Sequence, residues 1–176
     1  MRLDLTDVCS CENKEITKEV AIDIPSFDSK LGTFSFIEKK PFDLRFVNEE
    51  NKRLLIFGET SVMIAIPCDR CLEDVPTELH LVFDKEIPLE TTEETENEEE
   101  MDDADYMIGF NLDVDKLVYD EILVNWPMKV LCKEDCKGIC KHCGANLNRR
   151  TCDCAKTELD PRMAAIQDIF NKFKEV

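Results

Sequence analysis

The chain has 176 residues, of which 43% are hydrophobic and 35% are charged, and its formal net charge is −17. This length and apolar content suit a globular protein, and no segment has the roughly 18 consecutive apolar residues of a membrane-spanning helix. The first fifteen residues contain no apolar run long enough for a signal peptide. We therefore expect a cytoplasmic protein that has no membrane partner and keeps its thiols reduced.

The negative charge is concentrated in the middle of the sequence. Residues 84–121 contribute −14, whereas residues 1–83 contribute −6 and residues 122–176 contribute +3. Within this part, ETTEETENEEEMDDAD at 90–105 has ten acids, no base and no aromatic residue. Such a segment buries too little apolar surface to offset the entropy lost on ordering. We expect an acidic disordered loop over residues 89–109, which serves either solubility or docking to a partner.

Four segments alternate apolar and polar side chains, or run apolar between turn signals, as strands do. They are residues 16–25, 42–47, 53–66 and 78–84, and the polar turn NEENK at 48–52 joins the second to the third. No helical pattern separates them, so an antiparallel sheet is favoured over βαβ units. We expect residues 1–88 to form an antiparallel β domain that carries the motif CDRC, residues 68–71, between its last two strands.

Two amphipathic helices are predicted after the acidic segment. Asp113 is a suitable N-cap for a helix over residues 114–125. A second helix is predicted to begin at Asp160 and Pro161, and it carries an apolar stripe suited to core or partner contact. The predicted fold class is α+β: an antiparallel sheet meander packed with one or two helices, with a zinc-knuckle C-terminal region. We expect residues 110–176, which hold both helices and a cysteine-rich segment, to pack with the β domain.

The ten cysteines include two CxxC motifs, CDRC at 68–71 and CKHC at 140–143, and glycine follows the second. A CxxC pair followed by glycine forms a knuckle that directs two thiolates at one Zn²⁺ ion, which takes four ligands. The spacing favours two zinc sites, made of Cys68, Cys71, Cys132 and Cys136 in one, and Cys140, Cys143, Cys152 and Cys154 in the other. The alternative groups the four cysteines from 132 to 143 and pairs the last two with the CDRC motif. Cys9 and Cys11 are left over, and we expect free thiols on a mobile N-terminus.

A structural role for the metal is favoured over catalysis. Two sets of four thiolates leave no open coordination position, and the two histidines, His80 and His142, are expected to pack or to face solvent. CxxC is also a redox motif, but the thioredoxin-like βαβ pattern that it requires is absent around Cys68. An iron–sulfur cluster also takes four thiolates, so zinc and iron remain alternatives. We identify no catalytic residue and expect neither enzyme activity nor a small-molecule substrate.

Three motifs carry a resemblance to a known family: CDRC at 68–71, CKGICKHCGANLN at 136–148 and DPRMAAI at 160–166. With them, the chain resembles the YceD family, the large ribosomal RNA subunit accumulation proteins, over about residues 16–174. The resemblance implies a non-enzymatic factor for accumulation of large-subunit rRNA, and hence for ribosome assembly. The acidic insert and the pair Cys9 and Cys11 depart from the family pattern.

The cysteine-rich segment also carries positive charge. Between residues 129 and 156 there are seven basic residues and three acids. Such a cluster is typical of phosphate contact, although a zinc ion held by four thiolates carries a formal charge of −2 and offsets part of it. We predict RNA or partner binding at Lys137, Lys141, Arg149 and Arg150. The partner is either pre-large-subunit rRNA or a ribosomal protein or assembly factor; an adaptor unrelated to ribosomes and a thiol redox protein remain alternatives.

Overall fold

The computed structural model of the protein describes residues 1–89 and 106–154. The expected acidic segment at 90–105 and the expected helix from Asp160 lie outside these residues. The described chain is mostly antiparallel sheet with two helices, which agrees with the α+β class. In this part of the protein, no helix is long and apolar enough to cross a membrane.

The main sheet has six strands, and all of their pairings are antiparallel. They are β2 (Glu15–Val20), β3 (Ser26–Ser29), β4 (Gly32–Lys39), β5 (Phe42–Glu49), β6 (Arg53–Pro67) and β7 (Asp74–Pro88). The strands expected at 42–47 and 53–66 are present with nearly the expected bounds, and the strand expected at 78–84 is longer at both ends. β6 and β7 pair over their whole length, from Arg53 opposite Pro88 to Pro67 opposite Asp74.

The sheet is a meander in which two positions are each occupied by a pair of shorter strands rather than by one long strand. β2 and β3 share one position, and β4 and β5 share the next. β3 and β4 form one hairpin, and β2 and β5 continue the same antiparallel pairing further along, with Val20 opposite Phe42. β4 and β5 in turn lie against successive parts of β6. The break between β4 and β5 falls at Pro41, whose missing N–H group cannot donate to a sheet ladder. The sequence predicted neither β3 nor β4, because each is short or irregular in its alternation.

The N-terminal residues pair with residues 107–113 in a second, three-stranded sheet. It consists of β1 (Arg2–Asp4), β8 (Met107–Ile108) and β9 (Asn111–Asp113), and the helix α1 (Thr6–Cys9) follows β1. The side-chain amide of Asn48 donates to the carbonyl groups of Val8 and Cys9, which ties α1 to β5. The expectation of a mobile N-terminus is therefore wrong for these residues, and Cys9 is buried while Cys11 is exposed. β8 also begins before residue 109, the expected end of the acidic loop.

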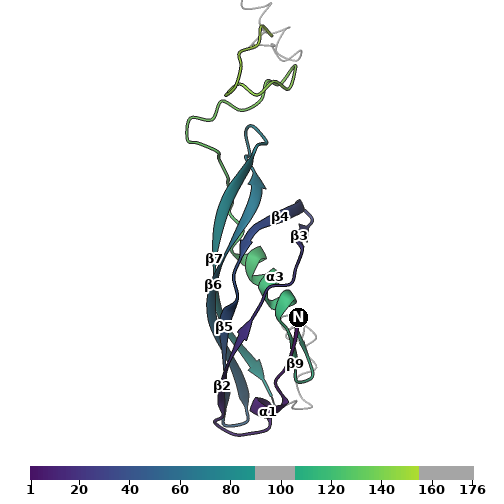
Figure 1. The fold of residues 1–176 in the computed structure, drawn as a ribbon, viewed down its shortest axis with the longest axis vertical. Helices are drawn as coiled ribbons and strands as arrows, with labels where there is room; N and C mark the ends of the chain where they lie inside the picture. Colours follow the sequence, from purple (N-terminus) through teal and green to yellow (C-terminus); the bar gives the residue numbers. More distant parts are fainter. Residues whose placement is uncertain (90–105, 155–176) are drawn as a thin grey trace, which may run out of the picture.

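The helix α3 (Val114–Val124) lies along the sheet and leads to the cysteine-rich segment, residues 130–154 (Figure 1). Its expected N-cap is confirmed, since the Asp113 carboxylate accepts hydrogen bonds from the amides of Asp115 and Lys116. One face of α3 is buried in the main core. Beyond its C-terminus, the Trp126 ring stacks on Phe27 of β3 at 5.1 Å between ring centroids. The chain after α3 then runs to the tip of the β6–β7 hairpin (Figure 1).

Candidate metal centres

Eight cysteines gather in two groups of four, and within each group all sulfur atoms lie within 4.8 Å of one another. The first tetrad is Cys68, Cys71, Cys132 and Cys136, and the second tetrad is Cys140, Cys143, Cys152 and Cys154. These are the two groups that the sequence spacing favours; the alternative grouping does not occur in the structure. Either tetrad can hold one metal ion, because four thiolates that converge in this way suit a tetrahedral cation.

The β6–β7 hairpin supplies half of the first tetrad. Its tip, residues 68–73, is closed by hydrogen bonds from the Cys68 amide to the Glu73 carbonyl (2.8 Å) and from the Leu72 amide to the Cys68 carbonyl (2.9 Å). Leu72 adopts the left-handed conformation, with φ of 61°, and so reverses the chain. The sulfur atoms of Cys68 and Cys71 are thereby fixed at the end of two long paired strands, and both residues are buried.

The other half of the first tetrad comes from the segment after α3. Asp69 holds this segment through both backbone polar groups of one residue: its amide donates to the Val130 carbonyl, and its carboxylate accepts from the Val130 amide at 2.7 Å. The guanidinium group of Arg70 donates to the Cys136 carbonyl at 2.9 Å. The Cys136 sulfur lies 3.8 Å from that of Cys68. Asp69 and Arg70, the two residues inside the CDRC motif, therefore position the ligands that come from elsewhere in the chain.

The second tetrad is built within a single short segment. The Cys140 amide donates to the Ala145 carbonyl (2.8 Å), and the Gly144 amide donates to the Cys140 carbonyl (2.9 Å). Gly144 has φ of 68°, a conformation that glycine adopts without strain. These bonds form the expected knuckle around CKHCG, and Cys152 and Cys154 return to it after the loop of residues 144–151.

The electrostatics of both tetrads favour a bound cation. Burial raises the pKa of the Cys68 thiol, but hydrogen bonds from backbone amides, the strongest from Cys132, outweigh burial and lower this pKa to about 6. Burial and hydrogen bonds to the neighbouring thiols raise the pKa of Cys132 to about 12. In the second tetrad, the Cys143 amide above all lowers the pKa of Cys140 to about 6, whereas the bond to the Cys143 thiol above all raises that of Cys154 to about 12. Four sulfur atoms this close cannot all ionise unless a cation neutralises them.

The two histidines lie outside both tetrads. His80 is exposed on β7, 3.3 Å from the hydroxyl group of Ser61, and His142 is exposed in the second knuckle. Neither contributes to the groups of metal-ligating atoms found in the described residues. The donor set of each tetrad is therefore sulfur alone.

Three of the four predicted basic residues surround a hollow beside the second tetrad. Lys137, Lys141 and Arg150 line it together with the apolar side chains of Ile139 and Leu147, and its volume is about 530 Å³. The fourth, Arg149, forms an ion pair with Glu73 at the hairpin tip. Arg149 thus contacts the first tetrad's scaffold, whereas the other three cations have no ion pair within the described part of the chain.

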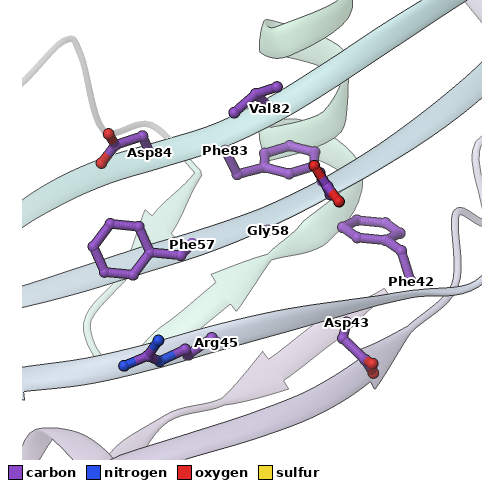
Figure 2. A pocket seen from close by; sticks show the side chains of 9 residues that line it. Phe42, Asp43, Arg45, Phe57, Gly58, Val82, Phe83 and Asp84 are labelled. Atoms are coloured by element: carbon purple, nitrogen blue, oxygen red, sulfur yellow. The ribbon is translucent and has the colours of Figure 1, made fainter.

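A hollow of about 650 Å³ on β5, β6 and β7 has the opposite charge (Figure 2). Three phenylalanines and three acids contribute to its lining: Phe42, Phe57, Phe83, Asp43, Glu59 and Asp84. Its one basic side chain, Arg45, is paired with Glu15 at 2.7 Å. This face repels phosphate groups, so the two hollows differ in the partners that they suit.

Gly138, between the two tetrads, permits the close contact of the cysteine-rich segment with the hairpin tip. It has φ of 76°, and a Cβ atom there would lie 2.9 Å from the Arg70 carbonyl oxygen. Gly138→Ala is therefore expected to break the hydrogen bond from the Ile139 amide to the Arg70 carbonyl, now 3.0 Å. Hydrogen exchange at Ile139 should accelerate strongly. Gly109→Ala is the control, because Gly109 has a similar φ but no atom within 4 Å of the added Cβ; equal exchange at Ile139 in both variants would contradict the argument.

The fold and the site define an α+β protein that holds two tetracysteine groups, one of them built on the end of a long hairpin. The family model described as "Large ribosomal RNA subunit accumulation protein YceD" matches residues 56–170, and the chain belongs to this family. The match includes both tetrads.

Curated relatives are distant in sequence. The chain is 27% identical over 139 residues to "Large ribosomal RNA subunit accumulation protein YCED homolog 1, chloroplastic" of Arabidopsis thaliana, which covers 65% of this chain and 43% of the relative. It is 27% identical over 111 residues to the uncharacterised protein YlbN of Bacillus subtilis, with 62% of each chain covered. An uncharacterised protein of Mycobacterium tuberculosis is 25% identical over 129 residues, 72% of this chain and 60% of the relative. The chain thus spans about half the length of these relatives, and no solved structure matches it.

Proposed function

We propose that this protein is a non-enzymatic cytoplasmic factor that supports accumulation of large-subunit rRNA by binding that RNA at its cysteine-rich end. The observation that carries the proposal is the family match over residues 56–170. The name of the Arabidopsis relative refers to the same process. The sulfur-only donor sets add that the cysteines serve structure, because they leave no position for a reacting molecule on a four-coordinate metal.

We propose Zn²⁺ as the ion in each tetrad, with the eight cysteines as its ligands. Zn²⁺ accepts four thiolates in a tetrahedron and has no redox chemistry of its own, which suits a site that only holds the chain in place. When bound, it supplies folding free energy to a segment that has little regular structure. The chain's own residues supply the rest: Asp69 and Arg70 hold the first tetrad's segment, and Gly144 shapes the second knuckle.

The RNA contact is proposed at the hollow beside the second tetrad. Lys137, Lys141 and Arg150 are exposed there without ion pairs in the described residues, so they are available to phosphate groups. The formal charge of −2 on each zinc tetrathiolate weakens the local field but does not cancel three cations around one hollow. The acidic hollow of Figure 2 disfavours RNA on the sheet. A ribosomal protein, which is basic in general, fits the cationic hollow less well than RNA does.

Removing the three cations tests this contact. The variant with Lys137→Gln, Lys141→Gln and Arg150→Gln is expected to bind transcribed large-subunit rRNA fragments more weakly than the native protein. The slope of log K against log salt should flatten by roughly 2, since each phosphate contact on a single strand contributes about 0.7. In a strain that lacks the native protein, the variant should fail to restore the ratio of large-subunit to small-subunit rRNA.

The matched control removes three cations in and just after the β3–β4 hairpin, with Lys30→Gln, Lys39→Gln and Lys40→Gln. It has the same net charge as the test variant, and its RNA affinity and salt slope should equal those of the native protein. Unchanged affinity and slope in the test variant would reject the RNA contact. If that variant still failed to restore rRNA, a protein partner at the same surface would be the function to pursue.

A further inference from the structure

The loop of residues 144–151 belongs to the second tetrad but also touches the first. The side-chain amide of Asn148 donates to the Cys136 sulfur at 3.2 Å. The Leu147 amide donates to the Gly138 carbonyl at 2.9 Å, and Arg149 pairs with Glu73 at the hairpin tip. We infer that the two tetrads bind metal cooperatively through this loop, and that Asn148 is the positioning residue that couples them. The inference rests on the metal binding proposed above and concerns only how the sites are linked.

The orientation of the Asn148 side chain is set by both of its polar atoms. Its oxygen accepts from the Lys137 amide at 2.9 Å, which leaves its NH₂ group to donate to the Cys136 sulfur. Its own backbone amide donates to the Asn146 side-chain oxygen at 2.9 Å. Asn148 therefore contacts a ligand of the first tetrad from within the loop of the second. A donor of this kind, outside the ligand set, commonly tunes metal affinity.

The spacer between the tetrads makes the contact rigid. Only residues 137–139 separate Cys136 from Cys140. Ile139 forms a β-bridge with Asn146 in the loop, and its amide donates to the Arg70 carbonyl at the hairpin tip. The loop, the spacer and the tip therefore form one hydrogen-bonded unit, and movement of the loop displaces contacts at both tetrads.

Coupling between two sites requires an element whose equilibrium both ligands shift. Here that element is the loop, either docked on Cys136 or undocked. Metal in the first tetrad fixes the position of the Cys136 sulfur, which accepts the hydrogen bond from Asn148, and so favours the docked loop. Metal in the second tetrad holds Cys143 and Cys152, which flank the loop, and lowers the entropy lost on docking. Each metal therefore raises the affinity of the other tetrad, and by the same factor.

The tetrads differ in how far they are preformed. Two ligands of the first tetrad are held at the tip of the β6–β7 hairpin, whereas all four ligands of the second come from residues 140–154. The first tetrad should therefore bind zinc more tightly and fill first. The second tetrad is the site at which the coupling is measured.

The experiment is a zinc titration of the full chain by chelator competition under anaerobic conditions. The titration gives two zinc affinity constants. The weaker one is assigned to the second tetrad if Cys140 and Cys143 are still alkylated at a zinc concentration that fills only one site. The same constant is then measured in the variant with Cys68→Ser and Cys71→Ser, which lacks the first site. We expect it to be weaker there by roughly 10-fold or more, the size of effect typical of partners that orient metal ligands.

Asn148→Ala, measured with and without the first site, completes a double-mutant cycle. In the chain with the native first tetrad it should weaken the second tetrad, and in the Cys68→Ser and Cys71→Ser variant it should have no further effect. Thr151→Ala, at an exposed position of the same loop without a hydrogen bond to Cys136 in the described residues, should leave the coupling unchanged. Equal constants for the second tetrad with and without the first would overturn the inference, as would coupling that survives Asn148→Ala. Absence of zinc from both tetrads would overturn the proposed metal as well, whereas loss of RNA binding with intact coupling would reject only the proposed function.

Discussion

Removal of the proposed zinc ions from the native protein is expected to unfold the cysteine-rich segment, residues 130–154, while the main sheet stays folded. A structural zinc contributes about 10–16 kcal/mol of apparent binding free energy, which matches or exceeds the net stability of a typical domain. The segment has no strand or helix of its own among its described residues, apart from the bridge of Ile139 with Asn146. The sheet and α3 instead share a large apolar core that includes no ligand cysteine.

Hydrogen exchange measured by mass spectrometry checks this outcome. After chelation, the amides of Cys140, Gly144 and Leu147 should lose protection, and those of β5 and β6 should keep it. Cys68→Ser should reproduce the loss around the first tetrad, whereas Cys11→Ser, an exposed cysteine outside both tetrads, should not. Protection that persists in the segment once the metal is gone would show that metal does not hold it.

Phe27→Ala is expected to lower the free energy of unfolding by about 3–5 kcal/mol, the usual cost of deleting a buried phenylalanine ring. Phe27 is fully buried, and its ring contacts those of Tyr119 on α3 and Trp126 just beyond it, with centroids 4.9 and 5.1 Å away. The contact holds the β3–β4 hairpin against the helix that leads to the cysteine-rich segment. The loss would therefore weaken the placement of that segment as well as the core.

Urea unfolding measures this change, with Leu31→Ala as the control. Leu31 lies in the turn of the same hairpin and is 69% exposed, so its truncation should change the stability by less than about 0.5 kcal/mol. Similar costs for the two variants would mean that the aromatic contacts do not stabilise the fold. A change in the slope of the urea dependence would instead indicate an altered unfolded state.

Periodic features of this fold are predictable from the sequence, since one residue pattern decides them locally. The alternation of Phe42, Leu44 and Phe46 predicts β5, and Asp113 before an apolar stripe predicts the start of α3. The two CxxC motifs likewise predict knuckles, and their spacing favours the grouping of cysteines that the structure has. In each case the residues that form the feature are neighbours in the chain.

Features that depend on long-range pairing were not predictable in this way. β1 is only three residues long, and it becomes a strand because residues 111–113 lie opposite it. The ion pair of Arg149 with Glu73 is a second long-range feature, because the two residues are 76 positions apart in the sequence. The sequence shows only the positive charge of Arg149 and not its partner. Asn148 lies inside the motif CKGICKHCGANLN, yet ligand-spacing rules consider only sulfur atoms and give no reason to select it.

The 15-residue strands of the β6–β7 hairpin make the molecule long (Figure 1). Its charge is unevenly distributed along the sequence. At about 3.3 Å per residue the hairpin spans about 50 Å. Residues 1–83 carry −6, whereas residues 122–154 have six bases and three acids, which gives +3 with neutral thiols and −1 once each tetrad holds a zinc ion at a formal charge of −2. In the field of the proposed RNA partner, the cysteine-rich end is repelled less than the sheet, so we expect the hairpin tip to lead the approach. Under the proposed function, the length of the hairpin would thus set the orientation of the first encounter, before any contact forms.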